Sequence, residues 1–361
     1  MRNDDYYDMR NIASPAAEPG KCPVAACAGP MARVSSQWGE MPYCTTHRIR
    51  IHHGSRTFVY YNGADTKSKR AAALRNLLFE TGYFERHILG NKYKAESHRF
   101  CNETSEDALT WNVFSRLATR QALGSLLSNL TTTQVTIEPE LYLWGLRINF
   151  LDSRPPEIFP ALQRARNQFE GDIRRFLTEP DIMLYVPGKM LVVIEAKFTS
   201  GNTVAKGTAG SDLAGEKPKS RGGIMDRYPI AVLPMASPAH DSTDSPFYAQ
   251  LYRNMIFAAQ MAQDLKVSWM LLSLVSRNRF SDSHKDACFR DPTPFFRSLL
   301  SRHCNERFRF YSWEQLYLDQ VANRPEMNDL AEYMYDKSAN GLRALSIASK
   351  ADQRSPGSAN V

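Results

Sequence analysis

The strongest constraint on the fold is the stretch from residue 179 to residue 200, EPDIMLYVPGKMLVVIEAKFTS. Two apolar runs flank the pair Pro187–Gly188, and a Pro-Gly pair between apolar runs favours a turn, so the stretch predicts a β-hairpin. Residues 191 and 193 make one face of the second run apolar, and residues 192, 194 and 196 do the same for the other face. We therefore expect a central strand that is covered on both sides.

Glu195 and Lys197 lie at the end of this apolar strand, and period-two alternation places them on the same face. Burying charges without partners is costly, so the two residues either pair with something or carry out chemistry. The turn decides where Asp181 lies. A two-residue loop would set Asp181 opposite Ile194, on the wrong face, whereas one extra loop residue or a bulge would set it opposite Glu195.

Two carboxylates beside one ammonium group suit the hydrolysis of phosphodiesters. Carboxylate oxygens hold Mg²⁺ while several waters stay on the ion. The metal neutralises charge that develops on the phosphate and lowers the pKa of a bound water. A nearby lysine can orient that water or stabilise the transition state.

The pair Pro180–Asp181, a gap of thirteen residues and then Glu195-Ala196-Lys197 resembles the signature of the restriction-endonuclease-like PD-(D/E)XK nucleases. The resemblance covers roughly residues 100–320. It implies an α/β fold in which a mixed central sheet is flanked by helices, with an αβββαβ core. It also implies cleavage of DNA, less often RNA, with Mg²⁺. The alternative is that Pro-Asp is a turn dipeptide and Glu-Ala-Lys an edge-strand salt bridge.

The resemblance also implies helical residues that complete the site. A helix before the hairpin commonly supplies one more acid, for which Glu106 is the first candidate and Glu103 the second. The helix after the second strand often lends a polar residue, and Gln250 and Arg253 are the candidates for contacts with metal-bound water or phosphate. For these two, a solvated polar face remains the alternative.

The N-terminal region contains Cys22-x4-Cys27, a gap of sixteen residues and then Cys44-x2-His47. Close pairs at both ends of a loop can converge on a tetrahedral Zn²⁺ ion, which would fold a segment too small for its own core. The first pair is wider than a C-x2-C knuckle. His52 or His53 could replace His47, and three unrelated thiols are the alternative interpretation. A site closed by four ligands is structural.

The formal net charge of +7 and the pI of about 9.0 favour polyanionic partners such as nucleic acid. No run approaches the roughly 18 apolar residues of a membrane span. The first 20 residues hold no apolar segment of the kind that secretory signals contain. We therefore expect a cytoplasmic protein without membrane contact.

Composition and helix signals predict the following organisation. The expected segments are a flexible leader (1–20), a zinc-binding module (21–63), a helical connector (64–104), a nuclease core (105–325) with a mobile loop (200–245), a C-terminal helix (326–350) and a disordered tail (351–361).

The sequence thus predicts a Mg²⁺-dependent nuclease that acts on DNA, with double-stranded DNA as the expected partner and a homodimer as a possible assembly. Asp181, Glu195 and Glu106 would hold the metal, and Lys197 would assist the water. The expected setting is restriction or anti-phage defence. The alternatives are a DNA repair or recombination nuclease and a non-catalytic nucleic-acid-binding protein on the same fold.

Overall fold

The chain divides into two compact units in the computed structural model. The first contains residues 1–120 and 316–361, and the second contains residues 121–315. The residues that the structure describes are 20–36, 39–51, 57–60, 66–90, 99–131, 133–150, 158–174, 177–205, 207, 215–233, 246–281, 283–300, 306–340 and 345–347. The expected leader up to residue 19 and the expected tail lie outside these residues. None of the described helices is long and apolar enough to cross a membrane.

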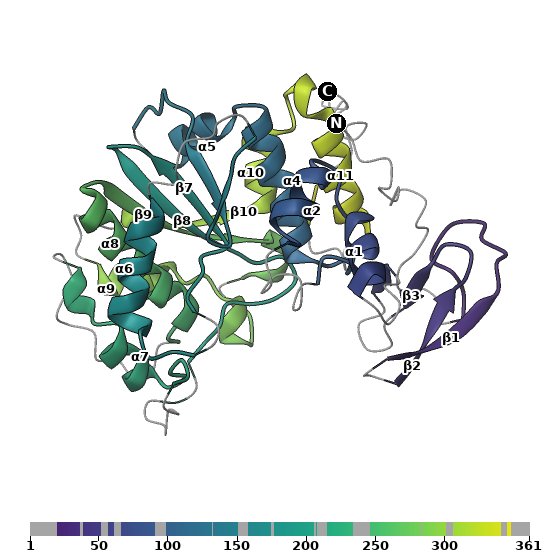
Figure 1. The fold of residues 1–361 in the computed structure, drawn as a ribbon, viewed down its shortest axis with the longest axis horizontal. Helices are drawn as coiled ribbons and strands as arrows, with labels where there is room; N and C mark the ends of the chain where they lie inside the picture. Colours follow the sequence, from purple (N-terminus) through teal and green to yellow (C-terminus); the bar gives the residue numbers. More distant parts are fainter. Residues whose placement is uncertain are drawn as a thin grey trace, which may run out of the picture. The chain divides into compact units, whose positions relative to one another are not determined.

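A small antiparallel sheet opens the first unit, with its strands in the order β1-β2-β3-β4 (Figure 1). The strands are β1 (Met31–Ser36), β2 (Gly39–Cys44), β3 (Ile49–Ile51) and β4 (Phe58–Tyr60). Ile49, Phe58 and Tyr60 are buried in an apolar cluster against which Cys22 and Cys27 pack. The cysteine pairs therefore lie on a folded scaffold.

Four α-helices lie entirely within the described part of the first unit. They are α1 (Thr66–Leu74), α2 (Thr81–His87), α4 (Glu106–Thr119) and α11 (Asn328–Asn340). The Ser105 side chain caps α4 by accepting a hydrogen bond of 3.1 Å from the backbone N–H of Ala108. The helix therefore begins directly after Ser105.

The second unit contains a six-stranded sheet in the order β10-β9-β8-β7-β5-β6 (Figure 1). The strands are β5 (Glu140–Leu143), β6 (Leu146–Ile148), β7 (Ile182–Val186), β8 (Met190–Ala196), β9 (Ser268–Val275) and β10 (Phe308–Ser312). The neighbours from β6 to β8 pair antiparallel, whereas β8, β9 and β10 pair parallel. The predicted α/β fold with a mixed sheet flanked by helices is therefore confirmed at this level.

One face of this sheet packs against helices α6, α8 and α9. The helices of the second unit are α5 (Leu123–Leu130), α6 (Ile158–Glu170), α7 (Arg221–Arg227), α8 (Ala249–Leu265) and α9 (Thr293–Leu299), and α10 (Trp313–Gln320) begins there. Met183, Tyr185, Leu191 and Val193 point into the core that these helices form with the sheet. Every residue of β7 and β8 is buried, which makes the hairpin central as predicted.

The hairpin has the extra loop residue that the sequence argument required. Its ladder runs from Ile182 opposite Ile194 to Val186 opposite Met190 and leaves a three-residue turn, 187–189. Gly188 in this turn has φ +67°, a conformation that side chains with a Cβ rarely adopt. Continuing the register by one residue places Asp181 opposite Glu195.

Two features differ from the sequence expectations. The stretch 200–245, expected as one long loop, contains α7, which forms because Ile224 and Tyr228 are buried and because Ser220 caps the helix. The compact units also divide the chain at other positions than the expected domains, since 105–120 and 316–325 fall in the first unit rather than with the sheet.

Candidate functional sites

The end of the central hairpin brings Asp181, Glu195 and Lys197 together. Glu195 is completely buried, and its Oε1 forms an ion pair with Nζ of Lys197, which is almost fully buried. The Oδ2 atom of Asp181 accepts a hydrogen bond of 3.0 Å from the backbone N–H of Ala196. Asp181 is only half-buried, so its carboxylate is more accessible than that of Glu195.

Helix α8 adds a residue that the sequence analysis did not assign. Asn254 donates a hydrogen bond of 2.8 Å from Nδ2 to Oε2 of Glu195, so each oxygen of this carboxylate has a partner. Ser273 of β9 pairs with Glu195 in the parallel ladder, and its buried Oγ has no hydrogen-bond partner within the described part of the chain. Asn254 directly follows Arg253 and could have been suspected, whereas the position of Ser273 depends on strand register.

The two predicted residues of α8 lie elsewhere. The Oε1 atom of Gln250 accepts a hydrogen bond of 3.3 Å from Oγ1 of Thr203. Arg253 is half-buried and interacts electrostatically with Lys217 and Tyr228. Among the described contacts, neither residue bonds to Asp181 or Glu195.

The predicted helix acids belong to the first unit. Glu106 is the first residue of α4 and is half-buried, so its proposed role beside Asp181 would join residues of two units and stays a prediction. Glu103 is completely buried, and burial raises its pKa to about 7 although Lys337 opposes this shift. The Nζ atom of Lys337 donates to Oδ1 of Asn76 (3.1 Å) and to the backbone carbonyl of Glu103. Glu103 therefore already has a charged neighbour within its own unit.

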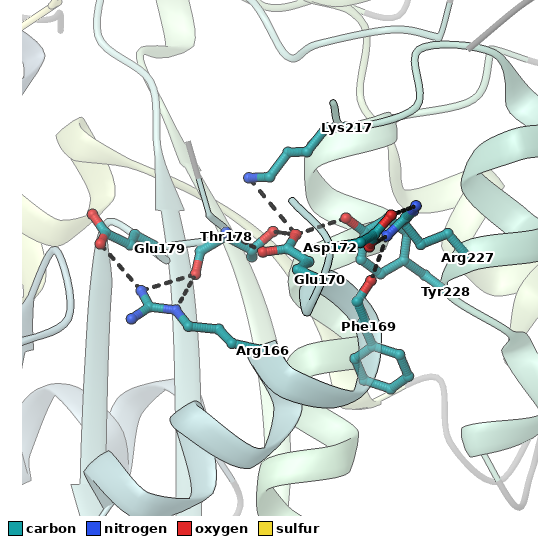
Figure 2. Close-up of polar contacts among 9 residues, drawn as sticks. All are labelled: Arg166, Phe169, Glu170, Asp172, Thr178, Glu179, Lys217, Arg227 and Tyr228. Carbon is teal, nitrogen blue, oxygen red and sulfur yellow. Dashed lines mark hydrogen bonds and ion pairs between the residues drawn. The ribbon is translucent and has the colours of Figure 1, made fainter. Parts of the chain in front are cut away.

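A buried polar network holds the segment that leads into Asp181 (Figure 2). The Glu170 carboxylate accepts hydrogen bonds from the Thr178 backbone N–H (2.6 Å), from the Thr178 hydroxyl and from the Tyr228 hydroxyl (2.6 Å). Arg166 donates from Nε and NH2 to the Thr178 carbonyl, at 3.2 and 3.1 Å. The C-terminal half of α6 thus fixes the backbone three residues before Asp181 and joins it to the end of α7.

Near the N-terminus, Cys22, Cys27, Cys44 and His47 form a second candidate site. Their ligand atoms all lie within 4.8 Å of one another. The distance is 3.8 Å between Sγ of Cys27 and Sγ of Cys44, 3.6 Å between Sγ of Cys44 and Nδ1 of His47, and 3.4 Å between Sγ of Cys22 and the same Nδ1. The spacing in the sequence predicted this group, although His52 and His53 lie outside the described residues.

These distances fit a tetrahedral metal ion. With Zn–S near 2.3 Å and Zn–N near 2.0–2.1 Å, tetrahedral geometry separates two sulfurs by about 3.8 Å and a sulfur from a nitrogen by about 3.6 Å. The backbone N–H groups of His47 and Gly29 donate to Sγ of Cys44 (3.3 Å) and of Cys27 (3.4 Å). This Cys3His group could therefore hold a metal ion such as Zn²⁺.

The thiols of this group differ in how readily they ionise. Burial raises the pKa of Cys22 to about 12. Burial also acts against ionisation of Cys44, but hydrogen bonds from the His47 backbone N–H and the neighbouring thiols lower the pKa of Cys44 overall. Because metal ions bind the thiolate form, loading this site would release protons.

The other described cysteines take no part in this group. Cys101 is buried and Cys288 is half-buried, and Cys304 lies outside the described residues.

Two cavities of about 620 Å³ lie in the second unit, away from the end of the β7–β8 hairpin that carries Asp181 and Glu195. Trp269 and Arg307 are among the residues that line one of them, and Asp291 and Arg297 are among those that line the other. Asp181, Glu195 and Lys197 line neither. The structure thus brings together three of the predicted catalytic residues and all four predicted metal ligands, whereas Gln250 and Arg253 make their described contacts elsewhere. No protein-family model matches the chain, and no curated protein or solved structure matches it.

Proposed function

We propose that this chain is a Mg²⁺-dependent nuclease that hydrolyses phosphodiester bonds in double-stranded DNA. The observation that carries the proposal is the position of Asp181 opposite Glu195, with Lys197 ion-paired to Glu195 at the same strand end. Ordinary packing does not require two carboxylates and a lysine at the end of a strand that is buried on both faces. Burial of such charges is costly, so their presence favours chemistry.

The topology around these residues supports the proposal. Strands β5, β7 and β8 form an antiparallel series, α8 follows, and β9 then pairs parallel to β8. This order supports the proposal of an αβββαβ core, in which β6 and α6 would be insertions between β5 and β7. Asp181 directly precedes the second strand of this series and Glu195 is the penultimate residue of the third, which supports the resemblance to the family.

Each residue of the site has a separate task in the proposed reaction. The oxygens of Asp181 and Glu195 are donors of the kind that Mg²⁺ prefers. Mg²⁺ held there would neutralise charge on the phosphate and activate a water molecule. Nζ of Lys197, which pairs with Glu195 when no metal is bound, orients that water or stabilises the developing charge. Asn254 keeps the Glu195 carboxylate in place.

The Cys3His group has a separate, structural role in this proposal. Four protein ligands leave no position open for a substrate, so bound Zn²⁺ would brace the loops around the β1–β4 sheet. Arg75 donates hydrogen bonds to the carbonyls of His47 (2.8 Å) and Arg48 (3.0 Å), which ties this module to the end of α1. Restriction or anti-phage defence is the setting that we propose for the nuclease, and repair or recombination is the alternative setting.

A non-catalytic nucleic-acid-binding protein is the second candidate. It is favoured by the complete burial of Glu195 and by the partners of both its oxygens, because a structural ion pair would have the same features. The net charge of +7 suits both candidates.

Incubation of the purified chain with plasmid, single-stranded DNA and RNA, with Mg²⁺ or with EDTA, separates the two candidates. We expect cleavage of plasmid only with Mg²⁺, and its loss in Glu195→Gln, a variant that keeps an oxygen acceptor for Asn254. Cleavage that survives in this variant would remove Glu195 from the mechanism, and cleavage in EDTA would contradict the need for Mg²⁺. Binding of DNA without any cleavage would favour the second candidate.

A further inference from the structure

Two cations lie side by side near the Glu170 network. Lys217 comes from the segment before α7, and its Nζ lies 3.8 Å from Oε1 of Glu170 (Figure 2). Its side chain is only 21% exposed. Arg253 of α8 interacts electrostatically with Lys217 and forms no hydrogen bond or ion pair within the residues that the structure describes. Two positively charged side chains therefore lie close together in a largely buried part of the second unit.

The negative charge nearby does not balance these cations. Arg166 and Glu179 pair with each other at 3.1 Å and cancel. Within the part of the chain that the structure describes, Glu170 is the remaining carboxylate that acts on Lys217, so Glu170, Lys217 and Arg253 together carry one positive charge. The pKa of Lys217 is lowered to about 8, chiefly by burial, while Glu170 opposes the shift and Arg253 adds to it. An additional negative charge at this place would therefore be stabilised.

Two separate links connect these cations to the proposed catalytic carboxylates. Glu170 binds Thr178, which precedes Asp181 by three residues, and three extended residues span at most about 10 Å. On α8, Arg253 directly precedes Asn254, whose side chain donates to Glu195. Thr178 and Asn254 thus connect the cations to both carboxylates of the proposed metal site.

We infer that Lys217 and Arg253 bind a phosphate of the DNA backbone next to the phosphodiester that is cut. This inference rests on the proposed nuclease function and adds a substrate-binding site to it. The guanidinium of Arg253 matches the geometry of a phosphate, and Lys217 supplies a point charge. One phosphodiester carries one negative charge and neutralises the group. Glu170 holds Lys217 in place until the phosphate arrives.

Salt dependence of DNA binding tests the inference without any need for cleavage. The full-length chain is titrated with a labelled DNA duplex in EDTA over a series of salt concentrations. Each phosphate contact contributes about 0.9 to the slope of log K against log salt concentration. We expect Lys217→Met and Arg253→Met each to lower the magnitude of the slope by about this amount, whereas Lys217→Arg and Arg253→Lys, which keep the charge, retain most of it.

The matched control is Lys189→Met. Lys189 is exposed in the turn at the opposite end of the β7–β8 hairpin, so this variant removes the same charge from the same unit. It should keep the wild-type slope. An equal loss in Lys189→Met, or wild-type slopes in both Lys217→Met and Arg253→Met, would overturn the inference even where Mg²⁺-dependent cleavage persists. If Lys217→Met and Arg253→Met lower the slope as expected but the wild type cleaves no nucleic acid, the proposed nuclease function would be overturned. The proposed phosphate-binding site would remain.

Discussion

The Asp181 carboxylate accepts a hydrogen bond of 3.0 Å from the backbone N–H of Ala196, the residue between Glu195 and Lys197. This bond joins the start of β7 to the end of β8. It depends on the three-residue turn 187–189, because a two-residue turn would move Asp181 to the other face. The geometry of a turn at one end of the hairpin thus determines which charges meet at the other end.

Replacing Lys197 should impair catalysis more than metal binding. In Lys197→Met, we expect turnover to fall on the order of 10²–10³-fold, because a cation that stabilises developing charge is lost. The Mg²⁺ concentration that gives half-maximal cleavage should change much less. A Mg²⁺ titration of plasmid cleavage measures both quantities, and thermal unfolding in Mg²⁺ checks the fold. Unchanged turnover would contradict the role of Lys197.

The hydrogen bond from Asn254 to Glu195 should contribute measurably to stability. Asn254→Leu leaves a buried carboxylate oxygen without its donor, so the free energy of unfolding should fall by about 1–3 kcal/mol in urea titrations without metal. Gln250→Leu on the same helix is the control. Its bond to Thr203 is exposed, and we expect a change within about 0.5 kcal/mol. Equal losses of unfolding free energy in the two variants would contradict a stabilising role of the hydrogen bond between Asn254 and Glu195.

The Cys3His group should bind one equivalent of Zn²⁺ in protein purified without chelators. Cys44→Ser should lose this zinc, as measured by elemental analysis, and should loosen residues 20–60 in hydrogen exchange because the metal stabilises this module. Cys288→Ser, which alters a half-buried thiol outside the group, should keep full zinc content. Wild-type protein without zinc would contradict the assignment, whereas Mg²⁺-dependent cleavage by Cys44→Ser would agree with a structural role.

The Glu103–Lys337 pair should make stability depend on pH. Because burial raises the pKa of Glu103 from 4.5 to about 7, its contribution to stability is present below pH 4.5 and is lost as the pH rises through 7. Glu103→Gln should remove the loss of stability with rising pH, because glutamine does not ionise. The backbone carbonyl at position 103 and Oδ1 of Asn76 would still accept hydrogen bonds from Lys337.

The comparison of wild type with Glu103→Gln is made at pH 5 and pH 7. Relative to the variant, the wild type should lose on the order of 1–2 kcal/mol of unfolding free energy between the two values. If the unfolding free energies of wild type and variant, measured in urea titrations, change equally between pH 5 and pH 7, Glu103 keeps the same charge at both pH values.

Short-range patterns in the sequence determined the parts of the sites that were predicted. Glu195 and Lys197 share a strand face because side chains alternate with period two, and the four metal ligands occupy two short stretches of chain. The apolar runs on both sides of the turn also indicated a central hairpin. Each of these inferences needs only local geometry.

Only the tertiary structure decided which distant residues surround these groups. The contact between Asn254 and Glu195 spans 59 positions, and the one between Glu170 and Tyr228 spans 58. The register of β9 brings Ser273 beside Glu195, and burial of Ile224 and Tyr228 forms a helix in a stretch without a periodic pattern. Such contacts depend on how α6, α7 and α8 pack on the sheet. Packing is set by the sum of many side-chain contacts, so no local pattern encodes it.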